Sequence, residues 1–240
     1  MLRIPSDADP QFDSLRDGIL GQAAKVMPAE EIAQRDRFKF DADRVRFAVC
    51  RSAVRRLLAG YLGAAPESLA FRQGEFGKPF LADPGNMSPS LQFNLSHSRR
   101  FAVLAVSLDQ ELGIDVESRE REVDALQLGK RVFTTDELGI LTRLDNEACR
   151  HTFFQYWTAK EAILKATGHG LSVDPREIEV ALPVSGTGRG GFSSTSQRVR
   201  GADWALQAFI AEDEYQISLA VCPSIKRDAI SLRYFDFKAS

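Results

Sequence analysis

Asp115 and Glu117 are two carboxylates placed two residues apart inside the apolar segment Gly113-Ile114-Asp115-Val116-Glu117. In a β-strand, residues i and i+2 point to the same face. We therefore expect Ile114 and Val116 to face the core and both carboxylates to project from the other side. Paired like charges repel and are costly to desolvate unless a cation lies between them. A hard divalent cation such as Mg²⁺ is the natural counter-ion, and a solvated strand face is the simpler alternative.

A second candidate segment is a predicted long helix over residues 148–167. Trp157, Glu161 and Lys165 are spaced i, i+4, i+8, so they share one stripe of that helix. If this stripe faces the strand, Glu161 becomes a third carboxylate for the same cation, and Lys165 could hold a negative group such as a phosphate. The alternative is a surface Glu–Lys pair worth about 0.2–0.5 kcal/mol.

Ser96 and His97 form a third candidate at the end of Phe93-Asn94-Leu95-Ser96-His97-Ser98. Adjacent residues on an extended chain point to opposite faces, so a nucleophile–base pair is not favoured. The hydroxyl and the imidazole could instead donate to an anion, or the histidine could simply cap its own loop. Upstream lies Gly77-Lys78-Pro79. The glycine allows another group to approach the backbone closely, the lysine supplies a positive charge, and the proline stiffens the turn.

Composition narrows the class of protein. The chain has 240 residues, 44% hydrophobic and 27% charged, with a formal net charge of −2. These values fit a globular protein and give no basic field for nucleic acid. Three scattered cysteines, the lack of a signal-peptide core, and the lack of 18 consecutive apolar residues predict a cytoplasmic protein with no membrane contact.

In the first half, apolar spacing predicts a helix from Asp41 that ends near Gly63. Its arginines indicate either a solvated helix face or a phosphate-binding edge. Residues 72–90 are predicted to be loop, and residues 91–95 a strand. Two further strands, 101–108 and 112–117, are predicted to pair as a hairpin.

In the second half, two short helices are expected to precede the long one. Strands are predicted after the long helix. The order along the chain is therefore helix, loop and strands, then helices and strands again, which indicates an α+β protein of two halves meeting near residues 109–112. A single α+β domain is the main alternative. The elements are helices at 123–132 and 135–144, a strand at 178–182, a mobile loop at 183–201, a hairpin of 204–210 with 215–221, and an edge strand at 230–237.

Taken together, four segments resemble the phosphopantetheinyl transferases of the larger, single-chain, surfactin-synthesis type. The likeness runs from about Arg35 to about Leu171. The matching segments, in order, are Gly77-Lys78-Pro79, Phe93-Asn94-Leu95-Ser96-His97-Ser98, Gly113-Ile114-Asp115-Val116-Glu117, and Trp157-Thr158-Ala159-Lys160-Glu161-Ala162-Ile163-Leu164-Lys165.

This resemblance implies a pseudodimer of two similar α+β halves, each a small antiparallel sheet packed with a long helix. Residues 1–110 are then expected to grip the nucleotide end of coenzyme A. Residues 111–240 are expected to carry the metal-binding carboxylates, the catalytic helix and the carrier docking surface.

The resemblance also implies an activity. Such enzymes transfer the 4′-phosphopantetheine arm of coenzyme A to a serine of an apo acyl, polyketide or peptidyl carrier protein, and they release adenosine 3′,5′-bisphosphate. Negative charge builds on phosphate oxygens during that transfer, so a metal clamp is the natural catalyst.

By the same resemblance, Asp115, Glu117 and Glu161 hold Mg²⁺. Glu161 is the candidate general base, with Glu137 as the second choice. Lys165 neutralises the pyrophosphate, and Lys160 is a weaker candidate for that role. The residues expected at the nucleotide end of coenzyme A are Arg46, Lys78, Pro79, Ser96 and His97.

Other functions stay open at this point. A Mg²⁺-dependent pyrophosphatase or phosphodiesterase acting on coenzyme A or a nucleotide would use the same carboxylates, and a non-catalytic carrier-binding module would need none of them. The type of carrier is not indicated; its docking surface is expected within residues 118–147. Two halves in one chain make a monomer sufficient.

Overall fold

The contacts of a computed structural model divide the chain into two compact units. Unit 1 comprises residues 1–71, 99–102 and 232–240, and unit 2 comprises residues 72–98 and 103–231. The division of the chain at residue 110 stays a prediction. The structure describes residues 2–5, 7–82, 91–168, 173–182, 193–199, 202–212 and 214–222.

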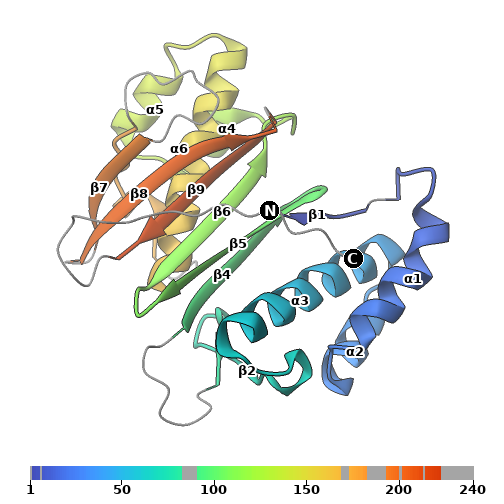
Figure 1. Ribbon diagram of the computed structural model, residues 1–240. Coiled ribbons are helices and arrows are strands. Elements are labelled where there is room, and N and C mark those ends of the chain that lie inside the picture. The colour runs from blue at the N-terminus through green and yellow to red at the C-terminus, as the bar shows by residue number, and fades with distance from the viewer. Residues whose placement is uncertain are drawn as a thin grey trace. The chain divides into compact units, whose positions relative to one another are not determined.

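Unit 1 is mainly helical (Figure 1), with α1 at Phe12–Ala24, α2 at Ala29–Asp36, α3 at Asp41–Leu62 and a short 3-10 helix at Pro66–Ser68. The helix predicted from Asp41 is confirmed. It ends at Gly63, whose φ of 63° is a left-handed conformation that glycine adopts without a side-chain penalty. A two-residue strand, β1 at Leu2–Arg3, pairs with the first residues of β5.

The arginines of α3 are occupied within unit 1. Arg55 is 1% exposed, and its guanidinium donates to both carboxylate oxygens of Glu31, at 2.7 and 3.0 Å. Arg51 also pairs with Glu31, at 3.1 Å, and Arg46 pairs with Asp43. A buried bidentate pair stabilises a fold only when its hydrogen bonds are complete; here Arg55 also donates to the carbonyls of Pro66 and Leu69. The arginines of this helix were expected to form a solvated face or a phosphate-binding edge. Arg55 does neither, because its side chain is buried and bonded within unit 1.

Unit 2 contains most of the β-structure. Strands β2 (Phe71–Gln73) and β3 (Pro79–Leu81) form a small sheet within the segment predicted to be loop, whose residues 83–90 lie outside the described part. Strands β4 (Leu91–Ser98) and β5 (Phe101–Leu108) are hydrogen-bonded neighbours, joined by a tight turn in which Arg99 has a φ of 50°.

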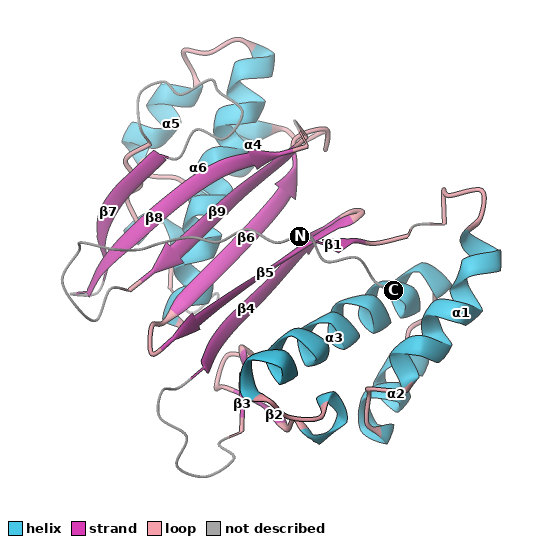
Figure 2. Cartoon of the chain, in the orientation of Figure 1, coloured by secondary structure: helices cyan, strands magenta, loops and turns pink. Residues whose placement is uncertain are grey.

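A four-stranded antiparallel sheet forms the rest of unit 2, in the order β6-β9-β8-β7 (Figure 2). The hairpin predicted between β5 and β6 is wrong. All seven residues of β6 (Leu112–Ser118) pair instead with β9 (Tyr215–Val221), which forms the predicted hairpin with β8 (Ala202–Ala211). The turn at Asp109 therefore moves the chain from one sheet to another.

One helix, α6 (Asn146–Thr167), packs on this sheet, and two shorter helices, α4 (Ala125–Val132) and α5 (Thr135–Leu141), pack against α6. Side chains of Asp124, Thr134 and Asp145 accept backbone N–H groups at the starts of α4, α5 and α6. The helix α6 lies along one face of the sheet, against β6 and β9. Its apolar side chains form the core with Trp204, Leu206 and Ala220, and each large one stabilises the fold by roughly 1.5–3 kcal/mol.

The α+β class predicted from the sequence is confirmed, but some details differ. Residues 178–182 are not a strand; a 3-10 helix at Pro175–Glu177 precedes them, and Ile178 and Val180 are buried without strand pairing. Part of the predicted loop at 183–201 is strand β7 (Ser193–Val199). The rest of that loop and the edge strand at 230–237 lie outside the described residues. Among those described, no helix has the length and apolar content needed to cross a membrane.

Candidate active site

Two strands from different sheets run side by side at the site. Asn94 Oδ1 on β4 accepts a hydrogen bond from the backbone N–H of Ile114 on β6, at 2.8 Å. Further along both strands, the hydroxyl of Ser96 donates to Asp115 Oδ1 at 2.8 Å, and the hydroxyl of Ser98 donates to Glu117 Oε2 at 2.7 Å. Because residue numbers rise together in these bonds, β4 and β6 run in the same direction, linked here by side chains.

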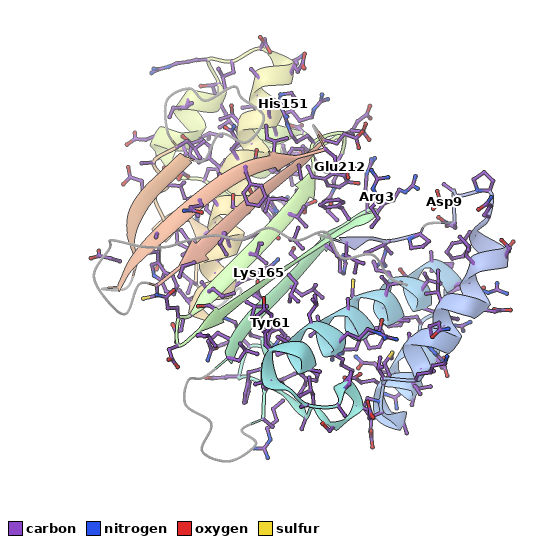
Figure 3. The ribbon with its side chains drawn as sticks, in the orientation of Figure 1. Arg3, Asp9, Tyr61, His151, Lys165 and Glu212 are labelled. Carbon is purple, nitrogen blue, oxygen red and sulfur yellow. The ribbon has the colours of Figure 1, made fainter. Side chains whose placement is uncertain are left out.

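Asp115 is buried, with 5% of its surface exposed, so the alternative of a solvated strand face is wrong for this residue. Lys165 is labelled in Figure 3. Its Nζ lies 2.6 Å from Asp115 Oδ1 and 2.9 Å from the hydroxyl of Ser96. Burial raises the pKa of Asp115, while Lys165 and Ser96 oppose that rise. The other oxygen, Oδ2, is buried and has no hydrogen-bond partner among the described residues.

Glu117 is the second carboxylate. Burial raises its pKa and the charge of Asp115 adds to that effect, while the hydrogen bond from Ser98 opposes it. The guanidinium of Arg121 lies 3.6 Å from Oε1 on the exposed side. Two carboxylates with raised pKa values so close together form a site where positive charge is favoured.

The helix α6 brings Glu161 and Lys165 to the same strand. Gly113 permits this approach, because a Cβ at this position would lie 2.2 Å from the carbonyl oxygen of Ala162. The face of β6 that carries Asp115 and Glu117 is therefore the face against α6, and not a face that projects away from the core. A second contact supports this orientation: the hydroxyls of Thr158 and Ser218 lie 2.8 Å apart, and Ser218 pairs with Asp115 across the sheet.

Glu161 lies within electrostatic range of both strand carboxylates. Burial raises its pKa, the charges of Asp115 and Glu117 raise it further, and Lys165 opposes the rise. The structure gives its carboxylate no hydrogen bond or ion pair to any described residue. The expected convergence of α6 and β6 is therefore present, with Glu161 free to accept a proton or a cation.

The oxygen donors of this site have the chemistry that suits a hard divalent cation, and Lys165 places a positive charge beside Asp115. In the described part of the chain, no three carboxylate, histidine or cysteine side chains are grouped closely enough to hold a metal ion. The buried, unpartnered Oδ2 of Asp115 is the observation that favours a missing ligand. Carboxylate oxygens are the ligands that Mg²⁺ prefers, and Asp115, Glu117 and Glu161 would supply them.

Comparison with known proteins identifies the family. Residues 111–220 match the family model of the 4′-phosphopantetheinyl transferase superfamily, and residues 17–109 match that of the 4′-phosphopantetheinyl transferase N-terminal region. A relative from Nostoc sp., 4′-phosphopantetheinyl transferase HetI, is 41% identical over 163 residues, covering 68% of each chain. The chain belongs to the 4′-phosphopantetheinyl transferase superfamily.

Two further likenesses extend the comparison. A 4′-phosphopantetheinyl transferase from Bacillus subtilis is 28% identical over 90% of this chain and 92% of its own length. The crystal structure of Thermotoga maritima holo-[acyl-carrier-protein] synthase covers 47% of this chain and 62% of that one, with a TM-score of 0.32 and 17% identity, which is too weak to support an argument. The family and enzyme class inferred from the sequence are thus confirmed.

In this transferase, Lys160 and Glu137 form a buried pair instead of an open site. Lys160 Nζ lies 2.6 Å from Glu137 Oε2, and both side chains are 3% exposed. The same ammonium donates to the carbonyls of Pro175 and Ile178. These three acceptors account for all three N–H donors of a lysine. Burial lowers the pKa of Lys160, and Glu137 opposes that shift.

Glu137 is equally occupied. Its carboxylate accepts the N–H of Thr134 in the capping box of α5 and the N–H of Val180. This arrangement argues against both expected roles, because neither Lys160 nor Glu137 has a free group to offer coenzyme A or the carrier serine. We therefore assign the pair a structural role, in which it ties α5 and residues 175–180 to α6.

The residues expected to grip the nucleotide are spread over the transferase. Lys78 Nζ donates to the carbonyls of Leu112 and Ala166, at 2.9 and 3.2 Å, so it joins the start of β6 to the last turn of α6. Pro79 follows as the first residue of β3, and His97 is exposed on β4. Arg46 lies in unit 1, where it pairs with Asp43. Their roles toward coenzyme A stay predictions.

Asn94, Ser98 and Gly113 are site residues whose contacts sequence reasoning did not foresee. The signal was present in the alternation of Asn94, Ser96 and Ser98, since residues two apart on a strand share a face. Pairing the neighbours Ser96 and His97 obscures this signal, because adjacent residues on a strand point to opposite faces. The contact between β4 and β6 does not follow from the sequence, because the local pattern predicts that β6 pairs with β5.

Proposed function

We propose that this transferase moves the 4′-phosphopantetheine arm of coenzyme A to a serine of an apo carrier protein and releases adenosine 3′,5′-bisphosphate. The observation that carries the proposal is the site on β6 and α6, where buried Asp115 pairs with Lys165 and one of its oxygens has no partner among the described residues. A buried, unsatisfied carboxylate oxygen is costly, and a bound cation would remove that cost.

Asp115, Glu117 and Glu161 are the residues that would hold Mg²⁺. When bound, this ion polarises the pyrophosphate of coenzyme A and neutralises the charge that develops on its oxygens. Carboxylate oxygens of these three residues would serve as its protein ligands, because Mg²⁺ prefers oxygen donors.

Lys165 supplies a positive charge from the chain itself. Its side chain is 29% exposed, and its bond to the carbonyl of Ile114 is long, at 3.4 Å. One N–H of this ammonium can therefore turn to a phosphate oxygen while the others stay on Ser96 and Asp115. A lysine held in this way stabilises the developing negative charge of phosphoryl transfer.

Glu161 is the proposed general base. A base works best when its pKa lies near the working pH, and burial moves the pKa of Glu161 upward from its usual acidic value. In the proposed step, Glu161 accepts the proton of the carrier serine hydroxyl. The serine oxygen then bonds to the β-phosphorus of coenzyme A as the bond from that phosphorus to the adenosine-side phosphate oxygen breaks.

The carrier docking surface is proposed on α4, α5 and their connections, within residues 118–147. Carrier proteins are typically acidic, so basic and apolar side chains suit their recognition. The exposed side chains of this kind include Leu126, Leu128, Lys130, Arg131, Ile140, Arg143 and Leu144. All three cysteines are free thiols, which fits the reducing cytoplasm as the compartment. The proposed active form is a monomer.

One assay tests this function. The protein is mixed with coenzyme A, Mg²⁺ and an apo carrier, and the intact mass of the carrier is measured. We expect the carrier to gain the mass of one phosphopantetheine arm. Consumption of coenzyme A without that gain would indicate hydrolysis and contradict the proposal, as would binding of coenzyme A with neither change.

A further inference from the structure

Ser98 is nearly buried, with 8% of its surface exposed, and its hydroxyl lies between two groups of β6. It accepts the backbone N–H of Ser118 at 3.2 Å and lies 2.7 Å from Glu117 Oε2. A serine hydroxyl has one proton to donate. The N–H of Ser118 bonds to a lone pair of this hydroxyl oxygen, so the hydroxyl proton is donated to the carboxylate of Glu117.

Ser96 repeats this arrangement two residues earlier. Its hydroxyl accepts from Lys165 Nζ at 2.9 Å and donates to Asp115 Oδ1 at 2.8 Å. Each serine of β4 thus meets one carboxylate of β6, and each fixes a single oxygen of it. The oxygens left over are Asp115 Oδ2, which has no partner in the described residues, and Glu117 Oε1, which has only the arginine at 3.6 Å.

We propose that Ser98 is a positioning residue that orients the Glu117 carboxylate for the cation. This inference rests on the proposed function, because it assumes that Glu117 is a ligand. Hydrogen bonds from residues behind metal ligands fix the ligand's orientation, and removing one typically weakens metal affinity by about 10–100-fold. Ser98 fits that role since its proton has one acceptor and its backbone is held in β4.

The test measures Mn²⁺ affinity by electron paramagnetic resonance on the full chain without coenzyme A. We expect Ser98→Ala to weaken Mn²⁺ binding about tenfold and to raise the KM for Mg²⁺ similarly. The kcat at saturating Mg²⁺ should stay close to that of the unmodified chain. Ser98→Thr retains the hydroxyl and should restore affinity.

Ser118→Ala is the matched control. Ser118 is buried, 1% exposed, and adjacent to Glu117, but its hydroxyl has no partner in the described part of the chain. This substitution removes a buried hydroxyl without touching a carboxylate, so Mn²⁺ affinity should not change. If Ser98→Ala does not fold, Ser98→Cys is measured in the same way, because a thiol of similar size is a weak donor.

The possible results separate the inference from the function. Wild-type binding of Mn²⁺ with unchanged affinity in Ser98→Ala, or in Ser98→Cys where that variant replaces it, overturns the role of Ser98 alone. An equal loss in Ser118→Ala also overturns it, by showing a general packing effect. Failure of the unmodified chain to bind Mn²⁺ overturns both the role of Ser98 and the proposed cation site. Arm transfer in the carrier mass assay tests the function independently.

Discussion

Asp115 and Glu117 differ in how the protein compensates their charge. Asp115 is deeply buried and pairs with Lys165, whereas Glu117 is only partly buried and has Ser98 as its close donor. Among the described residues, neither carboxylate has a close partner for both of its oxygens. An incompletely satisfied pair of this kind destabilises the fold and is therefore a sign of function.

The role of Glu161 leads to the first prediction. Glu161→Gln keeps the size of the side chain but removes the group that accepts a proton. We expect the rate of arm transfer to fall by about 100-fold or more, while coenzyme A binding measured by calorimetry changes little. Transfer at a rate comparable with that of the unmodified chain would remove Glu161 from the mechanism.

His97 gives the second prediction. The side chain is exposed on β4 and is expected to contact the 3′-phosphate of coenzyme A. His97→Ala should raise the KM for coenzyme A by about tenfold, the effect of losing one hydrogen bond to a charged group. Dephospho-coenzyme A, which lacks that phosphate, is the matched substrate and should show a much smaller change. Equal effects on the two substrates would exclude this contact.

At the scale of elements, the site depends on how closely α6 approaches β6. A methyl group on Gly113 would lie 2.2 Å from the carbonyl oxygen of Ala162 and 2.3 Å from the backbone nitrogen of Ala166. Both are backbone atoms, so no side chain can move away to make room. The helix itself would have to shift, and Glu161 and Lys165 would shift with it.

The third prediction follows from this contact. Gly113→Ala should lower the free energy of unfolding by about 1–3 kcal/mol or more and reduce arm transfer. Gly139→Ala in α5 is the control, because nothing lies within 4 Å of the added methyl group. A glycine in a helix interior costs about 0.5–1 kcal/mol relative to alanine, so this control should be neutral or stabilising. Denaturant unfolding of both variants checks the pair, and equal stabilities would contradict the argument.

The buried Lys160–Glu137 pair gives the fourth prediction. Removing one partner leaves an uncompensated buried charge, so Lys160→Met and Glu137→Gln should each destabilise the protein by about 3–5 kcal/mol. The double variant should lose less than the sum of the two single losses. Urea unfolding measures these values. If Lys160 instead held a phosphate, Lys160→Met would mainly raise the KM for coenzyme A, with little loss of stability.

At the scale of the molecule, the sequence predicted what depends on local spacing. The period of apolar residues predicted both long helices and the end of the first near Gly63; the second ends at Gly168. The placement of Glu161 and Lys165 on one stripe followed from the helical repeat alone. These features need no knowledge of distant parts of the chain.

Pairing between distant segments could not be predicted in this way. Apolar runs at 101–108 and 112–117 suggested a hairpin, yet β6 pairs with β9, about a hundred residues later. Local pattern does not distinguish a short connection within one sheet from a short connection between two. Similarly, Lys160 and Glu137 looked available in the sequence, and only their burial together shows that they are occupied.

The claim on which the account depends is that Asp115, Glu117 and Glu161 share one cation. Crystals grown with Mn²⁺ and coenzyme A test it directly through anomalous scattering from the metal. We expect one peak about 2 Å from a carboxylate oxygen of each of the three residues, with Asp115 bound through Oδ2. A peak elsewhere, or coenzyme A bound with Lys165 still paired to Asp115 and no metal beside Glu161, would contradict the account.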